Sequence, residues 1–274
     1  MALKTILVHV ADDDQYKKRL KVAIALARRN KAHVTALHVT SSTDARAAVI
    51  GRAASARFSE AAVEDARKKA EEMKADFNAA CVAKKVSHRW VVEDGDHLEL
   101  LEEHARVADL VIVSQSKNRY LEDFFRHQLP EQIVVKSGCP VLIIPRKWRV
   151  KTTISSILIA WKSDREAVRS VRDSLEFLKK AKRVQALTVS HGEELDGLPV
   201  DQLIMYLARH GVDVEHIHED HSDVSEAIIE TSIKEDHDMV VMGGFGQSRI
   251  KEMVLGSVTN TVLRKMKLPV LISY

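Results

Sequence analysis

One stretch of the chain has residue types and spacing that suit the binding of a phosphate group. Gly243 and Gly246 follow the apolar run 239–242, and Gly256-Ser257 comes after nine further residues. Glycine lets a backbone approach a ligand closely, and the start of a helix offers unpaired N–H groups and a positive dipole end. The stretch therefore predicts a strand, a glycine-bounded loop and a helix that begins at a phosphate. It is neither a Walker A loop nor a G-x-G-x-x-G dinucleotide motif.

Composition limits the kinds of partner. The chain has 274 residues, of which 45% are hydrophobic and 30% charged, as in ordinary globular proteins. A net charge of +3 and 5% aromatic residues argue against nucleic-acid binding. Two cysteines without a C-x-x-C pair indicate neither a disulfide framework nor a zinc finger. No apolar run suggests a signal peptide or a membrane helix, so we expect a cytoplasmic protein without a membrane partner.

The elements that position the glycine stretch occur twice in the chain. The segment 109–113 (DLVIV) matches 238–242 (DMVVM) at a separation of 129 positions (238 − 109). The same separation carries the Pro-Val-Leu-Ile of 140–143 onto that of 269–272. We therefore predict two copies of one domain, residues 1–147 and 152–274, joined by a short basic and polar linker.

Within each copy, short apolar strands alternate with amphipathic helices. This pattern is typical of an α/β fold, in which a parallel sheet is covered by helices on both faces. Capping boxes are expected at Ser163 with Glu166, at Asp96 with Glu99 and at Asp223 with Glu226. The predicted strands are 5–10, 33–39, 88–93, 110–114 and 141–144 in copy one, and 156–161, 183–189, 213–218, 239–242 and 270–273 in copy two.

The spacing Gly243-x-x-Gly246, nine residues, Gly256-Ser257 resembles the nucleotide-binding signature of the universal stress protein family. The resemblance extends over nearly the whole chain as two tandem family domains. It implies two Rossmann-like domains of the adenine nucleotide alpha hydrolase type, each a five-stranded parallel sheet of order 3-2-1-4-5. It also implies that the domains pair through their last strands, as an internal pseudo-dimer.

The resemblance further implies a ligand and the residues that hold it. The ligand would be ATP or another adenine nucleotide, with or without Mg²⁺, and the protein a regulatory one in the stress response. The phosphates and ribose would be held at the glycines and serine of the signature, and the adenine would meet the backbone of Val189. The complete set of expected binding residues is Gly243, Gly246, Gly256, Ser257, Met242, Val258, Thr259, Val189, Trp161 and Lys162.

Two departures from the family pattern bear on the ligand. Family members carry an acidic residue near the adenosine, at the end of the first strand, where this chain has Lys162. Lysine cannot accept a hydrogen bond, and it meets either a phosphate or solvent. In copy one the four signature positions hold Ser114, Lys117, His127 and Gln128, and side chains at the three former glycine positions would fill the space that the phosphates need. We expect copy one to be a structural or interaction half.

Other functions remain open from the sequence. The signature supplies binding groups and no general base, which favours a binding protein over an enzyme. A slow ATP-hydrolysing or adenylyl-transferring enzyme and a nucleotide-free scaffold are the alternatives, and a homodimer and an unidentified protein partner are further possibilities. The cluster His216, His218 and His221 suggests a metal site, but a polar edge strand accounts for it better.

Overall fold

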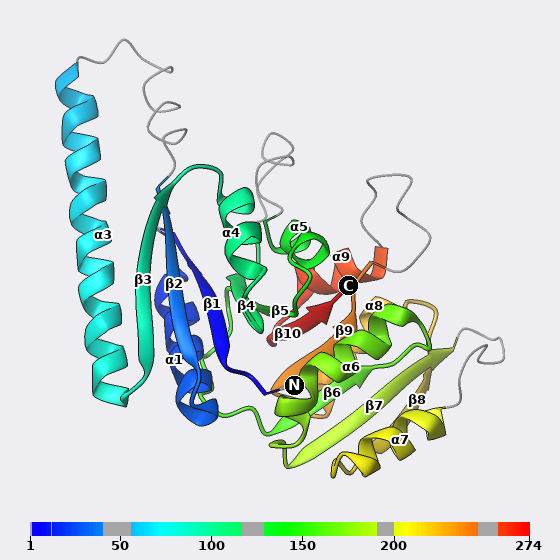
Figure 1. The fold of residues 1–274 in the computed structure, drawn as a ribbon. Helices are drawn as coiled ribbons and strands as arrows, with labels where there is room; N and C mark the ends of the chain where they lie inside the picture. The colour runs from blue at the N-terminus through cyan, green and yellow to red at the C-terminus, as the bar shows by residue number, and fades with distance from the viewer. Residues whose placement is uncertain (1, 12, 41–55, 117–128, 191–199, 246–256) are drawn as a thin grey trace. The chain divides into compact units, whose positions relative to one another are not determined.

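Among the described residues, strands and helices alternate within each copy (Figure 1). In a computed structural model, residues 2–11, 13–40, 56–116, 129–190, 200–245 and 257–274 are described. The first copy contains β1 (Thr5–Val10), α1 (Tyr16–Asn30), β2 (His33–Thr40), α3 (Ala56–Lys84), β3 (Ser87–Asp94), α4 (His97–Ala105), β4 (Leu110–Ser114), α5 (Leu129–Lys136) and β5 (Val141–Ile144). The second contains β6 (Ser156–Ala160), α6 (Arg165–Leu178), β7 (Arg183–Ser190), α7 (Val200–Arg209), β8 (Glu215–Asp220), α8 (Val224–Lys234), β9 (Met239–Gly243), α9 (Ser257–Lys265) and β10 (Val270–Ser273).

The strand order confirms the predicted fold class. The first copy follows β3-β2-β1-β4-β5 and the second β8-β7-β6-β9-β10, which is the order 3-2-1-4-5 in each. In the first copy β1 pairs with β2 and β4, and β2 with β3, all in parallel; in the second copy β9 pairs with β10 and β6, and β7 with β6 and β8, again in parallel. The strands lie within one residue of their predicted bounds, except that β8 begins and ends two residues later than expected.

The last strands of the two copies pair with each other. Val270 of β10 lies opposite Ile143 of β5 in antiparallel register, which confirms the expected pairing. Both strands belong to one compact unit, Met1–Ala2 with Val113–Tyr274, and the other unit is Leu3–Ile112. The division therefore falls inside β4, and the domain limits 1–147 and 152–274 stay a prediction.

Helices cover both faces of the strands in each unit. In the unit Leu3–Ile112, α1 packs on β2, α3 packs on β3 and against α1, and α4 contacts β1 and β2 (Figure 1). In the unit that contains the second copy, α6 packs on β9 and β10, whereas α8 packs against α9. Right-handed crossovers account for this arrangement, because connections that run in opposite directions along a sheet lie on opposite faces.

Burial along the strands follows their place in the sheet. The central strands β1, β4, β5, β9 and β10 are nearly all buried, as their continuous apolar sequences require. The outer strands β3 and β8 instead alternate exposed and half-buried residues. The histidines of β8 therefore lie on an edge strand.

Three helices begin at an aspartate cap. Asp96 and Asp223 each accept hydrogen bonds from the two backbone N–H groups expected of a cap. The predicted cap at Ser163 is wrong, because Asp164 is the cap of α6 and accepts from Ala167 N at 2.8 Å. The helix starts one residue later than expected, since a carboxylate outcompetes the neighbouring hydroxyl for the free N–H groups.

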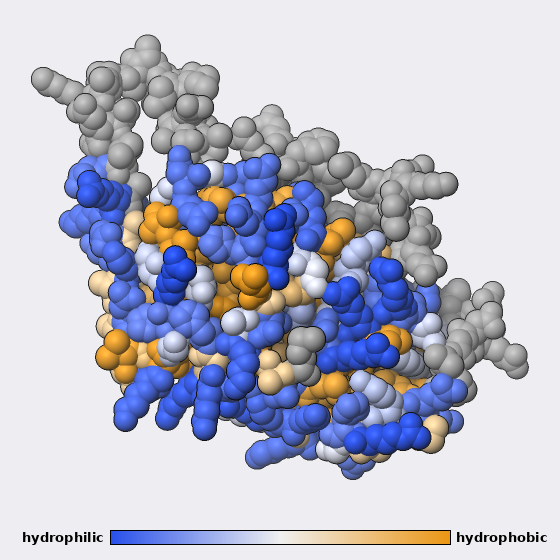
Figure 2. Space-filling model, in the orientation of Figure 1, coloured by the Kyte–Doolittle hydropathy of each residue, from blue (hydrophilic) through white to orange (hydrophobic). Residues whose placement is uncertain are grey.

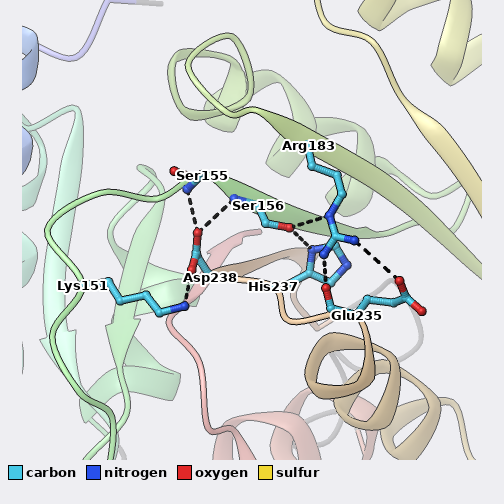
Figure 3. A network of polar contacts seen from close by, with 7 residues as sticks. All are labelled: Lys151, Ser155, Ser156, Arg183, Glu235, His237 and Asp238. Atoms are coloured by element: carbon cyan, nitrogen blue, oxygen red, sulfur yellow. Dashed lines mark hydrogen bonds and ion pairs between the residues drawn. The ribbon is translucent and has the colours of Figure 1, made fainter.

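A carboxylate joins the beginnings of two neighbouring strands in each copy. Asp238, just before β9, accepts hydrogen bonds from Ser155 N (2.8 Å) and Ser156 N (3.0 Å) at the start of β6, and from Lys151 Nζ (2.6 Å) (Figure 3). Asp109, just before β4, accepts from Lys4 N (2.7 Å) and Thr5 N (2.8 Å) at the start of β1. We call these contacts the carboxylate clasps, and their repetition supports the duplication independently of the glycine motif.

The second clasp extends into a part-buried network. His237 Nδ1 lies 2.9 Å from Ser156 Oγ, which also accepts from Arg183 Nε at 3.0 Å (Figure 3). The Arg183 guanidinium also bonds the backbone carbonyl of Glu235. The network ties β6, β7 and the turn before β9 at the amino ends of the strands, opposite the predicted ligand site.

The visible surface is mostly hydrophilic. On the face shown in Figure 2, hydrophobic residues lie in small groups separated by hydrophilic ones. Among the described residues, no helix is both long and apolar enough to cross a membrane.

Asp238→Asn should destabilise the protein by about 2 kcal/mol at pH 7, because it removes charge-assisted hydrogen bonds. Burial alone would raise the pKa of Asp238, but the bonds from Lys151, Ser155 and Ser156 outweigh burial and lower it. A lowered pKa in the folded state stabilises above the ordinary pKa, and this stabilisation is lost as pH falls below about 4. Urea unfolding at pH 7 and pH 3 measures the difference. Asp213→Asn, at an exposed site, should cost little, and an equal loss there would contradict the clasp.

His237→Asn should make the free energy of unfolding depend less on pH between about pH 6.5 and about pH 4. Burial, assisted by Arg183, lowers the pKa of His237 to about 4. The unfolded chain therefore binds this proton first, and stability falls as pH drops from about 6.5 to about 4, by at most about 1.4 kcal/mol per pH unit. Urea unfolding across this range should show a shallower slope in the variant than in the wild type. His210→Asn, outside the network, should keep the slope, and an unchanged slope in His237→Asn would contradict the assignment.

Candidate nucleotide site

The predicted site residues gather at the carboxyl ends of the parallel strands. Met242 is buried near the end of β9, and Gly243 pairs with Ser273 of β10. Trp161 follows β6, and its backbone N–H donates to Leu187 O of β7 at 2.8 Å. Because β6, β7 and β9 are parallel, their carboxyl ends share one edge, where ligands of such sheets bind.

The start of α9 is tied to the chain that leaves β9. Phe245 N donates to Thr259 Oγ1 at 3.3 Å, and both residues are buried. Val258 is half-buried beside it. This hydrogen bond closes the two ends of the glycine-bounded segment, whereas Gly246 and Gly256 lie outside the described residues. The predicted binding residue Thr259 thus has a structural partner as well.

Gly243 is required by packing, not by an unusual backbone angle. A Cβ atom there would lie 2.5 Å from Ala167 N and 2.7 Å from Glu166 C, both in the first turn of α6. At Gly244, a Cβ would lie 2.6 Å from Ile272 Cγ2. The glycines let α6 and β10 approach the end of β9, and this brings the N-terminus of α6 to the same edge.

Among the described residues of this stretch, Phe245 has a positive φ of 54°. A bulky residue in the left-handed region is strained and is found where the surroundings enforce it. The bond to Thr259 and the burial of the Phe245 ring provide that enforcement. The residue types do not signal this angle, because Phe245 stands between two glycines, which adopt a positive φ without strain.

Lys162 lies at the turn between β6 and α6 with an exposed side chain. Its carbonyl accepts from Asp164 N at 2.7 Å, which forms the turn. The residue therefore adds a positive charge at the carboxyl edge without filling it.

Two buried polar atoms flank this turn without a protein partner in the described part of the chain. They are the indole Nε1 of Trp161 and Oε2 of Glu166. From its sequence position, Glu166 is expected in a capping box and not among the site residues. A signal was present, because Glu166, Ser170 and Ser174 follow one another at four-residue spacing beside the apolar stripe of α6, and all three are buried.

At the corresponding edge of copy one, polar residues replace two of the glycines. Gln115, which stands where copy two has Gly244, donates from Nε2 to Leu263 O (2.8 Å) and Arg264 O (2.9 Å) at the end of α9. Ser114, the first degenerate signature position, ends β4 and is half-buried. Lys117, His127 and Gln128 lie outside the described residues.

The histidines of β8 bond to hydroxyl groups. Thr188 Oγ1 lies 2.8 Å from His216 Nε2 and 3.1 Å from His218 Nδ1, and Ser190 Oγ lies 3.2 Å from His218 Nε2. Burial lowers the pKa of His216, and the nearby His218 adds to this effect. Within the described ranges, no group of three or more His, Cys, Asp and Glu residues is arranged to hold a metal ion.

Comparison with known proteins agrees with the duplication. The model of the universal stress protein family matches residues 2–145 and again 160–273. The chain belongs to the universal stress protein family. No curated protein sequence matched it.

Solved structures show the same tandem fold for this universal stress protein. A universal stress protein from Archaeoglobus fulgidus DSM 4304 is 16% identical, with a TM-score of 0.79 over 98% of this chain and 95% of its own. A Pseudomonas aeruginosa UCBPP-PA14 protein assigned to the same family is 19% identical, with a TM-score of 0.60 over 99% of this chain and 93% of its own. Adenine-nucleotide binding is typical of the family.

Gly243→Ala should destabilise the protein by about 1–3 kcal/mol, because the added methyl group overlaps backbone atoms of α6 that cannot rotate away. Thermal and urea unfolding measure the loss. In the control Gly95→Ala, the new Cβ meets the flexible end of Leu100 at 3.2 Å, so the cost should be smaller. Wild-type stability in Gly243→Ala would contradict the close packing of β9 on α6.

Proposed function

We propose that the second copy of this universal stress protein binds an adenine nucleotide, ATP being the first candidate, and that the first copy is a structural or interaction half. The observation that carries the proposal is the hydrogen bond from Phe245 N to Thr259 Oγ1, which joins the two ends of the glycine-bounded segment. This bond brings the end of β9 and the beginning of α9 together at the carboxyl edge. A helix start at this place suits phosphate.

The polar groups at the edge support a ligand with both donors and acceptors. Trp161 Nε1 is a buried donor and Glu166 Oε2 a buried acceptor, and neither has a partner among the described side chains and backbone. Lys162 adds an exposed positive charge that can meet a phosphate. Buried polar atoms normally have partners, so unpartnered ones at a predicted site favour a ligand over a vestige.

The difference between the copies supports a single nucleotide site. At the edge of copy one, the amide of Gln115 binds the end of α9, whereas Gly244 at the matching place carries no side chain. In copy one, Ser116 Oγ also donates a hydrogen bond to the carboxyl group of Glu131, and burial raises the pKa of this carboxyl group. We therefore assign the ligand to copy two and regulation through nucleotide occupancy to the whole chain. Occupancy changes a surface or an assembly only if the nucleotide binds the two states unequally.

The experiment compares two matched variants, Gly256→Asp in copy two and His127→Asp at the equivalent position of copy one. ATP at 100 times its Kd should stabilise the wild type by about 2.7 kcal/mol, seen as a rise in Tm. Gly256→Asp should abolish this rise because it places a negative charge at the expected phosphate site, whereas His127→Asp should keep it. Equilibrium dialysis with ATP checks the affinity directly.

The opposite pattern, with ATP stabilisation lost in His127→Asp and kept in Gly256→Asp, would move the site to copy one. Absence of any ATP effect on the wild type at millimolar concentration would refute nucleotide binding. Mass spectrometry of small molecules that copurify with the protein identifies which adenine nucleotide is bound.

A further inference from the structure

Glu166 is a buried acid in the first turn of α6. The residue is 2% exposed, and its backbone lies against Gly243 at the end of β9. The residue comes from the turn that follows β6, so it lies at the carboxyl edge that holds the predicted nucleotide site. It is not one of the residues that the glycine signature marks.

The carboxyl group of Glu166 is only partly satisfied. Oε1 lies 3.6 Å from Nε of Arg165, whose side chain is largely exposed and also lies over the ring of Tyr274. Oε2 has no hydrogen-bond donor in the described part of the protein. Burying such an acceptor without a donor costs folding free energy, so a retained one calls for a functional explanation.

The donor that fits this acceptor is a neutral hydroxyl or amino group. A phosphate does not fit, because two negative groups repel each other in a buried place. An adenine nucleotide offers its ribose hydroxyls and its 6-amino group. Glu166 lies beside Gly243 of β9, whereas Val189, expected at the adenine, lies on β7 with β6 between. The ribose joins the base to the phosphates, and its hydroxyls are therefore the donors nearest to Glu166.

We propose that Glu166 accepts a hydrogen bond from a ribose hydroxyl of the bound nucleotide and so selects ribonucleotides over deoxyribonucleotides. The inference rests on the proposed function. It gives the site an acidic acceptor although the place at the end of β6 holds Lys162. It also explains why an acid is buried on the face of α6 that packs against β9.

The test measures ATP, 2′-deoxy-ATP and 3′-deoxy-ATP binding to the wild type and to Glu166→Met, by isothermal titration calorimetry. Methionine has a similar length and cannot accept this bond well. The wild type should bind ATP about tenfold or more tightly than one of the deoxy analogues, the magnitude expected for a hydrogen bond to a charged group. Glu166→Met should weaken ATP binding by the same factor and leave that analogue unchanged, as a double-mutant cycle requires.

Stability provides a second readout. Ligand-free Glu166→Met should have a higher Tm than the wild type, because an unpartnered acceptor is replaced by an apolar group at a buried site. Glu166→Gln keeps the shape and one acceptor oxygen, and should bind ATP with intermediate affinity. The matched control Glu176→Gln, on the same helix and paired with Lys180 at 3.2 Å, should leave nucleotide binding unchanged.

The outcomes separate this inference from the function on which it rests. If Glu166→Met keeps the wild-type preference for ATP over both deoxy analogues, the ribose contact is refuted while nucleotide binding stands. Equal losses for all three nucleotides together with a lower Tm would show a purely structural role and also refute it. A wild type that binds none of the three nucleotides refutes the proposed function, and the ribose contact falls with it.

Discussion

The carboxylate clasps set the register on which the rest of each copy depends. Asp238 holds two N–H groups at the start of β6 while its own chain continues directly into β9. The neighbouring strands then run in step, so that Ala160 pairs with Met242 at the other end. A carboxylate that accepts several N–H bonds is a strong and directional constraint. The clasp at the amino edge of the sheet therefore determines which residues lie side by side at the carboxyl edge, where ligands bind.

The two copies share this frame and differ where it matters for a ligand. Both have the clasp, the strand order and the aspartate cap before their fourth strand. After that strand, copy one uses the Gln115 side chain to bind the end of α9, whereas copy two has glycines that bring α6 and β10 close. The pairing of β5 with β10 therefore joins two halves that are alike in backbone and unlike in surface chemistry.

The candidate site shows a conflict between stability and function. Gly243 and Gly244 give close packing, yet Phe245 has a strained backbone and Glu166 buries an acceptor that has no donor among the described residues. Strained backbone and unsatisfied polar groups lower the stability of the fold and are retained where they contribute to binding. Both features lie at the carboxyl edge. The polar network of Asp238, Arg183 and Ser156 at the amino edge has more hydrogen bonds, although Nε2 of His237 there also has no partner among the described residues.

The sequence by itself determined the duplication, the α/β class, the position of almost every strand and the place of the glycine signature. Hydrophobic runs, glycine spacing and repeated segments are local or pairwise features, and they can be recognised in the sequence without knowing any tertiary contact. Asp96 and Asp223 were predictable as caps for the same reason. Family resemblance supplied the strand order, which no local pattern contains.

Only the tertiary structure decided why the site residues are what they are. Gly243 is glycine because the first turn of α6 lies against it, and Glu166 is buried because that same approach covers it. Neither fact can be derived from residue types, since Gly243 and Glu166 are far apart in the sequence and their contact depends on how β6, α6 and β9 pack. Sequence fixes which groups are present, whereas packing decides which of them lose water and which lack a partner.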